Sequence, residues 1–166
     1  VFIRLREAPA GDLPWWPIWQ PVGEPIALEG RWHVEFVEGG PVLPPPFETD
    51  RLDSWAVLGG ADAGSFAGTA RYRLRFEWHS REQAEEWRLD LGDVRESARV
   101  FLNGQFVGTA WCLPFQLLVG PYLRSGFNEL VLEVTNLCAN RIRAMDRAGV
   151  PWKRFGNIGI VNVRYQ

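Results

Sequence analysis

The stretch Ala98–Gly120, ARVFLNGQFVGTAWCLPFQLLVG, contains the clearest local structural signal in the sequence. Its Asn103-Gly104 pair tolerates the positive φ angles that a two-residue type I′ turn requires, and apolar residues flank the pair on both sides. We therefore predict a tight antiparallel hairpin centred on this pair. A loop with Trp111 and Pro114-Phe115 follows, and then a further strand over Gln116–Val119.

Apolar and polar residues alternate with a period of two along much of the chain. The pattern is clearest over Ala70–His79, where an aromatic or leucine residue occupies every second position. Because successive side chains of a strand point to opposite faces, this spacing predicts a half-buried strand. Similar strands are predicted at Arg31–Val37, Trp87–Leu91, Phe127–Thr135 and Ile160–Tyr165. The predicted core residues are Tyr72, Leu74, Phe76, Trp78, Leu89, Val100, Leu102, Leu130, Leu132 and Val134.

Few segments are predicted to be helical. Only Leu137–Ala148 is long enough for a helix of several turns, and Arg81–Glu86 and Pro121–Arg124 suit a turn or so each. Residues 52–58 contribute Trp55 to the apolar pattern, and residues 61–64 are predicted to form a turn. Many short strands separated by turns predict an all-β sandwich of two antiparallel sheets.

Length and charge limit the classes of function. A chain of 166 residues fits one domain, and its formal charge of −2 provides no basic excess for binding a phosphate backbone. No apolar run approaches the roughly 18–20 residues of a membrane span. We therefore expect neither a nucleic acid nor a membrane as partner. Cys112 and Cys138 match no metal spacing; we expect two buried free thiols, with a disulfide between them left open.

The first 29 residues differ in composition from residues 30–166. Val1–Arg6 is predicted to be a short strand, and Glu7–Pro25 is an extended proline-rich segment with Trp15, Trp16 and Trp19. One interpretation is an apolar strap along this domain or a neighbouring one; the alternative is that one tryptophan stacks on a sugar. Since no methionine opens the chain, we expect an excised or processed piece.

The sequence shows no motif for self-contained catalysis. No phosphate-binding loop, nucleophile–base pattern or cluster of metal ligands is present. Glycoside hydrolysis needs only two carboxylates, roughly 5–9.5 Å apart. The candidates are Asp50, Asp53, Asp90, Asp93, Glu96 and Asp146. Because no spacing pairs two of them, we predict no catalytic residue, no metal site and no cofactor, although a structural calcium is an alternative that such folds allow.

The connection Asn136–Phe155 is the predicted ligand-facing surface. At about 20 residues it is long for a compact domain, and long connections are usually functional or disordered. Its apolar residues argue against disorder, and its polar side chains suit a sugar. The predicted carbohydrate-binding residues are Asn140, Arg141, Asp146 and Trp152, with Trp111 from the loop after the hairpin. The alternative is structural: Arg141 pairs with Asp146, and Trp152 closes the end of the sandwich.

An ordered series of short motifs supports a resemblance to known proteins. The motifs are Asp53-Ser54-Trp55, Phe66 to Tyr72, Leu89-Asp90-Leu91-Gly92, Ala98 to Gly104, Gly108, Trp111, Pro114-Phe115, Leu123 to Leu130 and Val134-Thr135-Asn136. Over roughly residues 30–165 this series resembles the sugar-binding domain of glycoside hydrolase family 2. It resembles more closely the related domain of enzymes similar to family 106 α-L-rhamnosidases, which usually have serine where Ala67 stands.

The resemblance implies a galactose-binding-like jelly roll and a non-catalytic role in binding carbohydrate or positioning substrate. Such a chain would be a C-terminal fragment of a larger glycoside hydrolase, with an oligo- or polysaccharide and the neighbouring catalytic domain as partners. In family 2 the matching connection carries an acid and a tryptophan, which Asp146 and Trp152 parallel. A polysaccharide-degrading parent would favour a secreted or periplasmic location. A purely structural domain and an autonomous glycosidase are the alternatives.

Overall fold

The computed structural model describes residues 24–79, 86–155 and 161–163. The elements are, in chain order, β1 (Trp32–Gly40), β2 (Phe47–Thr49), α1 (Trp55–Leu58), α2 (Gly60–Ser65), β3 (Ala67–Trp78), β4 (Arg88–Asp90), β5 (Ser97–Leu102), β6 (Gln105–Ala110), β7 (Gln116–Leu118), η1 (Gly120–Tyr122), β8 (Gly126–Thr135), α3 (Ala139–Arg147), β9 (Lys153–Phe155) and β10 (Val161–Val163). The predicted strand Val1–Arg6 lies outside the described residues. So does the tryptophan-rich segment Glu7–Pro25, except for Glu24 and Pro25.

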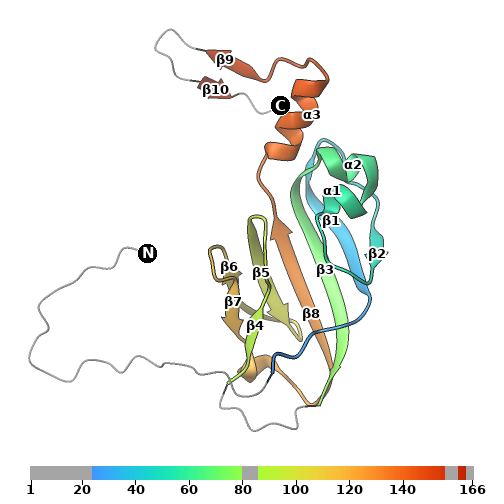
Figure 1. Cartoon of the computed structure of the whole chain (residues 1–166), viewed down its shortest axis with the longest axis vertical. Helices are drawn as coiled ribbons and strands as arrows, with labels where there is room; N and C mark the ends of the chain where they lie inside the picture. Colours follow the sequence, from blue (N-terminus) through green and yellow to red (C-terminus); the bar gives the residue numbers. More distant parts are fainter. Residues whose placement is uncertain (1–23, 80–85, 156–160, 164–166) are drawn as a thin grey trace, which may run out of the picture.

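A six-stranded antiparallel sheet forms one layer of the fold, in the order β2-β1-β3-β8-β5-β6 (Figure 1). β3 and β8 lie at its centre and pair from Thr69 opposite Thr135 to Trp78 opposite Gly126. These two strands carry the longest alternating patterns in the sequence. The pattern predicted both strands, because one apolar face of each must be buried while the other bears charges.

The predicted hairpin is confirmed. Asn103 has φ of 54° and Gly104 has φ of 77°, and Leu102 pairs with Gln105 across the turn. An Asn-Gly pair reaches this left-handed region at little steric cost, which explains why a two-residue turn forms here.

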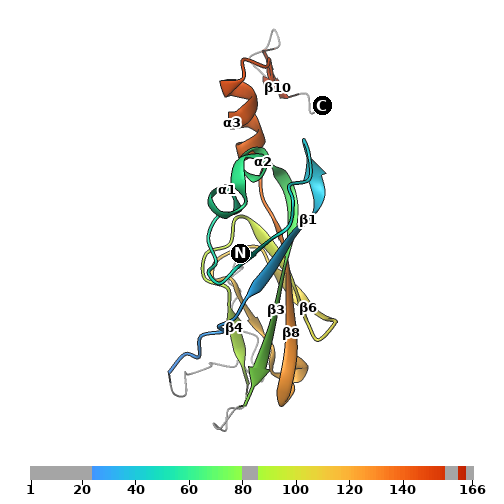
Figure 2. The same ribbon diagram turned by 90° about the vertical axis from the view of Figure 1, so that its right-hand side faces the viewer.

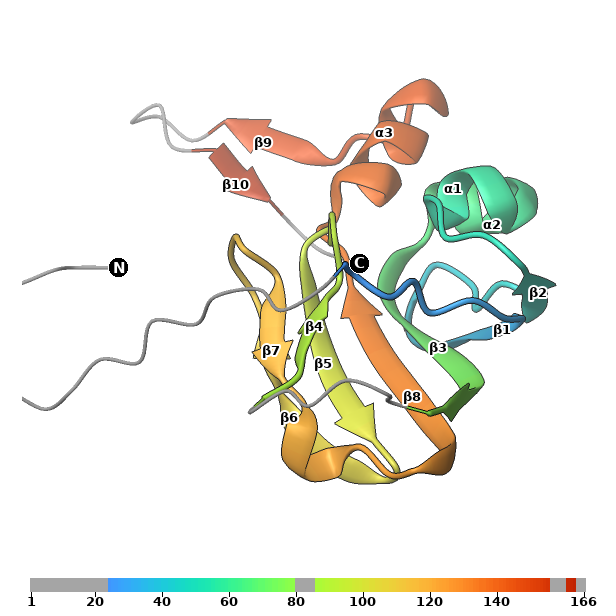
Figure 3. The ribbon, with the colours of Figure 1, turned by 60° about the horizontal axis from the view of Figure 1, so that its bottom comes forward.

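The second layer is the two-stranded sheet of β4 and β7, which lies against the β5–β6 side of the larger sheet (Figure 2 and Figure 3). Gly108 of β6 allows a close approach of the layers, because a Cβ there would lie 3.1 Å from Leu117 of β7. The predicted all-β sandwich is therefore the observed architecture, with many more of the described residues in antiparallel strands than in helices.

The predicted core residues lie between these layers. Seven of the ten are buried, namely Tyr72, Leu74, Phe76, Val100, Leu102, Leu130 and Leu132. Trp78, Leu89 and Val134 are half-buried and pack against this cluster. Trp78 contacts Trp87 edge to face, with ring centroids 4.8 Å apart. The prediction is confirmed for these ten residues.

Residues 55–65 form the short helices α1 and α2, whereas the sequence predicted only a turn at residues 61–64 and no helix here. The side chain of Ser54 accepts a hydrogen bond from the backbone nitrogen of Ala56 and so caps α1. Trp55 is buried between Phe36 and Phe66, at ring distances of 5.7 and 5.9 Å. This aromatic contact is made by residues far apart in the sequence, so local patterning did not reveal it.

The C-terminal elements extend beyond one end of the sandwich (Figure 1 and Figure 2). The predicted helix in 137–148 is confirmed as α3, and η1 matches the predicted turn near Pro121. β10 pairs with β9 in a separate two-stranded ladder, so it does not extend the sandwich as its alternation suggested. The segment 81–86 lies outside the described residues except for Glu86. None of the helices described is long and apolar enough to cross a membrane.

The prediction that both cysteine thiols are buried was wrong. Cys112 and Cys138 are both free, and both are exposed. Each follows the end of a strand, Cys112 after β6 and Cys138 after β8, where neither layer covers it.

Candidate functional site

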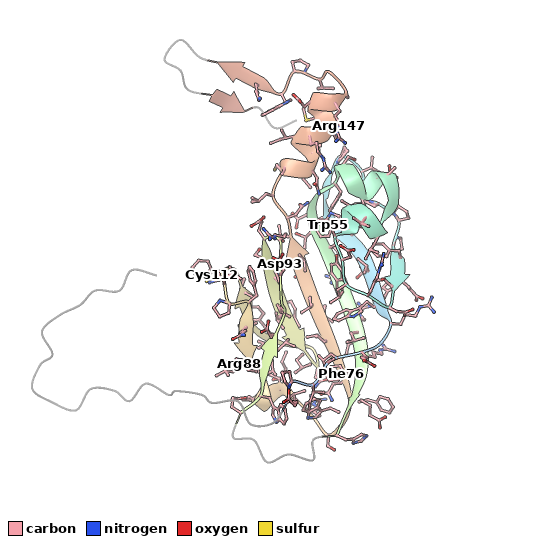
Figure 4. The ribbon with its side chains drawn as sticks, viewed as in Figure 1. Trp55, Phe76, Arg88, Asp93, Cys112 and Arg147 are labelled. Atoms are coloured by element: carbon pink, nitrogen blue, oxygen red, sulfur yellow. The ribbon has the colours of Figure 1, made fainter. Side chains whose placement is uncertain are left out.

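A cleft with a volume of about 700 Å³ lies beside α1 in the described chain. It opens where the β4–β7 sheet does not cover the large sheet. Figure 4 labels Trp55 at the start of α1 and Asp93 beyond the end of β4, and these residues line two sides of the cleft. The lining residues are Leu52, Asp53, Ser54, Trp55, Tyr72, Leu91, Asp93, Val94, Arg95, Glu96, Ala98, Leu132, Val134, Asn136, Leu137, Ala139 and Asn140.

The floor of the cleft is apolar. Tyr72 of β3, Ala98 of β5 and Leu132 of β8 belong to neighbouring strands, and all three are buried. Burial raises the pKa of Tyr72 to about 12, so its hydroxyl is protonated at neutral pH. A floor of this kind favours the carbon-bound face of a ligand over a charged group.

One polar wall comes from the segment before α1. Oδ1 of Asp53 accepts a hydrogen bond from the backbone nitrogen of Ser54 at 2.7 Å. The Ser54 hydroxyl is engaged in capping the helix, at 3.3 Å from the nitrogen of Ala56. Asp53 is exposed, and this hydrogen bond holds one of its carboxylate oxygens in place.

The opposite polar wall is the loop between β4 and β5. Arg95 donates from Nη2 to Oδ2 of Asp93 at 2.9 Å, and this hydrogen bond raises the pKa of Arg95. The backbone nitrogen of Glu96 donates to the carbonyl of Thr135 at 2.8 Å and so joins the loop to the end of β8. All three side chains are exposed. The loop thus brings two carboxylates and a guanidinium to the edge of the cleft.

Asn136 also lines the cleft, but its side chain is engaged in the fold. Its Oδ1 accepts from the backbone nitrogen of Gly68 at 2.8 Å, and its Nδ2 donates to the carbonyl of Phe66 at 3.1 Å. The motif Val134-Thr135-Asn136 singled this residue out, yet its structural role depends on a segment nearly 70 residues earlier.

The predicted carbohydrate-binding residues do not all gather in this cleft. Asn140 lines it, near the start of α3. Arg141 follows on α3 and is half-buried, whereas Trp111 lies on the β6–β7 loop with 68% of its surface exposed. Neither Trp111 nor Arg141 lines the cleft.

Asp146 and Trp152 form a pair of their own beyond the cleft. Nε1 of Trp152 donates to Oδ1 of Asp146 at 3.2 Å, and Nζ of Lys153 lies 4.1 Å from the Trp152 ring centroid. Among the described residues, Arg141 is not among the partners of Asp146, so the alternative of an Arg141–Asp146 ion pair does not match the structure. Trp152 is half-buried, and the ammonium group of Lys153 makes a cation–π contact with its ring.

Sequence reasoning identified the acids of the cleft but not their arrangement. Asp53, Asp93 and Glu96 were among the candidate carboxylates, although nothing in their spacing joined them. They meet because α1 and the β4–β5 loop lie on two sides of one uncovered area of the sheet. In the part of the chain that the structure describes, no three histidine, cysteine or acidic side chains form a group that could hold a metal ion.

The comparisons with known proteins point to carbohydrate-active enzymes. No family model matches the chain. It is 36% identical over 137 residues to a protein named "Putative beta-glucuronidase" from Formosa agariphila, covering 81% of this chain and 12% of that protein. The chain therefore spans about an eighth of the length of this curated relative.

Solved structures agree. A rhamnosidase from Novosphingobium sp. PP1Y matches with a TM-score of 0.64 and 32% identity, over 75% of this chain and 12% of that one. The β-glucuronidase of Bifidobacterium dentium, solved with coumarin-3-O-glucuronide, matches with a TM-score of 0.53 and 25% identity, over 65% of this chain and 19% of that one. The chain is similar to one part of larger glycoside hydrolases. This supports the predicted resemblance at the level of rhamnosidases and β-glucuronidases.

Proposed function

We propose that this chain is a non-catalytic carbohydrate-binding or substrate-positioning domain of a larger glycoside hydrolase, with a galactose-binding-like jelly roll. The observation that carries the proposal is the cleft, which combines an apolar floor with a hydrogen-bonding rim on a fold shared with parts of a rhamnosidase and of β-glucuronidases. Its partners are then an oligo- or polysaccharide and the neighbouring catalytic domain.

The chemistry of the cleft suits a saccharide. A sugar ring presents C–H groups on its faces and hydroxyl groups around its edge. The half-buried apolar side chains of Leu91 and Val134 complement the C–H groups. The carboxylates of Asp53 and Glu96 accept hydrogen bonds from the hydroxyl groups, and the amide of Asn140 can accept or donate. Sites for small ligands commonly combine an apolar surface with a few polar groups in this way.

Residues of α3, together with Trp152 just before β9, supply the second part of the proposed surface. Asp146 fixes the orientation of the Trp152 ring through their hydrogen bond, which prepares the ring for stacking. Arg141 provides donors on the same helix, and Asn140 joins this surface to the cleft. Trp111 would contribute a further exposed aromatic ring from the β6–β7 loop.

A purely structural role is the second candidate, and the β6–β7 loop favours it. Trp111 and Leu113 are 68% and 77% exposed, Leu118 of β7 is 42% exposed, and exposed apolar clusters often mark contacts between domains. In that case the loop would pack against the catalytic domain, and the chain would support that domain without touching saccharide.

Glycan-array binding of the purified chain, followed by affinity measurements on single variants, distinguishes the two roles. Glycan binding should weaken in each of the variants Asn140→Ala, Asp146→Ala and Trp152→Ala. The melting temperature of each variant should stay near that of the unsubstituted chain. Arg147→Ala is a matched control, since Arg147 is an exposed residue of α3 with no assigned role. Absence of binding to every glycan would contradict the proposal and leave the structural role.

The same preparation tests the non-catalytic assignment. We expect no turnover of aryl glycosides above the buffer rate, because no pair of acids with catalytic roles was identified. Turnover that disappears when Asp53, Asp93 or Glu96 is replaced would instead indicate an autonomous glycosidase.

A further inference from the structure

We infer that the cleft beside α1 selects neutral saccharides and disfavours uronic acids. This inference rests on the proposed function and specifies the class of sugar. The comparison proteins do not decide the point, since one is named a rhamnosidase and others are β-glucuronidases, one of them solved with a glucuronide. The inference comes instead from the charges and the apolar floor of the cleft.

The cleft has an excess of negative charge. Its lining contains three carboxylates, Asp53, Asp93 and Glu96, against one guanidinium, Arg95, so the net charge of the lining is −3 + 1 = −2. The guanidinium is already engaged, because Arg95 lies 2.9 Å from Asp93. Among the ion pairs of the described chain, none involves Asp53 or Glu96. A uronate would therefore meet uncompensated negative charge.

The cations of α3 do not reverse this balance. Arg143 is the one that reaches toward the cleft, where it lies 3.5 Å from Oδ1 of Asn140, and the same Nη2 is 3.4 Å from the carbonyl of Gly64. It is exposed and does not line the cleft. A uronate carboxylate in the cleft thus has no free guanidinium in the lining with which to form the bidentate pair that stabilises bound carboxylates.

The floor favours neutral sugars for a second reason. Leu91 and Val134 at the floor are half-buried rather than fully buried, so they offer carbon surface and no polar side-chain atoms. A neutral sugar can place its C–H groups on this floor and donate its hydroxyl protons to Asp53 and Glu96. A carboxylate on the same ring would lose hydration without gaining a donor.

The test uses matched glycosides that differ only in oxidation at C6. The purified 166-residue chain would be titrated at low ionic strength with methyl glucoside and methyl glucuronide, and with methyl galactoside and methyl galacturonide, while NMR shifts report the site. In at least one pair we expect the neutral sugar to bind on the order of tenfold more tightly, since the net negative charge of the lining repels the carboxylate of the uronide.

Variants show whether the cleft charges cause the preference. Asp53→Asn combined with Glu96→Gln should narrow the difference in affinity to about threefold or less, because this change removes the two carboxylate charges of the lining that form no ion pair. Asp62→Asn is the matched control: Asp62 is an exposed acid of α2 that does not line the cleft, and the preference should not change. Added salt should also narrow the difference.

The outcomes distinguish the proposed saccharide-binding role from the inferred preference for neutral sugars. Uronides that bind as tightly as the neutral sugars would overturn the charge inference while leaving the saccharide-binding role intact. A neutral preference that persists in the double variant, shown to be folded by its melting temperature, would overturn the cleft as its source. If no glycoside in either pair shifts any resonance of the cleft, the proposed function itself fails.

Discussion

Nδ2 of Asn103 donates a hydrogen bond to Oδ1 of Asn128 at 2.8 Å, which joins the turn of the β5–β6 hairpin to the start of β8. Asn128 is 3% exposed. Its amide also bonds the backbone of Arg124 and the carbonyl of Gly126, and Oδ1 of Asn103 accepts from the nitrogen of Glu129. The asparagine that forms the turn therefore also fixes the position of the central strand.

Replacement of Asn128 by alanine should destabilise the domain by at least about 2 kcal/mol, because each buried polar group left without a partner costs about 1–3 kcal/mol. The measurement is the urea midpoint of unfolding. Gln105→Ala is the control, since Gln105 is exposed beside the same turn and should change stability by about 0.5 kcal/mol or less. An unchanged midpoint for Asn128→Ala would show that this network does not stabilise the fold.

A glycine pair between β1 and β3 leads to a second prediction. Gly39 and Gly68 face each other in the ladder, and a Cβ on Gly68 would overlap the carbonyl oxygen of Glu38. Gly68→Ala should therefore cost at least about 2 kcal/mol through overlap and strained backbone. Gly40→Ala is the control, because a Cβ there meets nothing within 4 Å. Equal melting temperatures for the two variants would contradict this account.

Burial of Tyr72 should make the free energy of unfolding depend on pH in the alkaline range. Its pKa is raised to about 12 in the folded state by burial, against about 10 in the unfolded chain. The folded state keeps the phenolic proton where the unfolded state loses it, so this contribution is complete below pH 10. It should be lost as the pH rises from 10 to 12, by about 2–3 kcal/mol in all. Denaturant unfolding across this range is the measurement.

The matching variants are Tyr72→Phe and Tyr122→Phe. Removal of the Tyr72 hydroxyl should flatten the alkaline fall in stability, whereas Tyr122→Phe should retain it. If the free energy of unfolding falls equally steeply with pH in the unsubstituted chain and in Tyr72→Phe, another group is responsible.

We further predict that a chelator leaves the melting temperature unchanged. Calcium prefers several oxygen ligands at once, and the described residues contain no group of three histidine, cysteine or acidic side chains suited to a metal. A thermal scan with and without chelator checks this. A lower melting temperature with chelator, reversed by added calcium, would reveal a structural metal site.

The alternating strands and the hairpin could be predicted because their signals are local. A period of two along β3 and the Asn-Gly pair at 103–104 specify strand faces and turn geometry within a few residues. The helices α1 and α2 could not be predicted in this way. Their burial depends on Trp55 packing between Phe36 and Phe66, which are brought together by the sheet. Likewise, the role of Asn136 depends on Gly68, its partner across the ladder end.

By itself, the sequence determined that the chain forms an all-β sandwich around the Ala98–Gly120 hairpin, because backbone preferences and face alternation act over neighbouring residues. Only the tertiary structure decided where the polar groups meet. Asp53 precedes α1 and Glu96 precedes β5, more than 40 residues apart, and they line one cleft because the small second sheet leaves the floor between them uncovered. The composition of a site with such distant walls follows from packing, which no local pattern encodes.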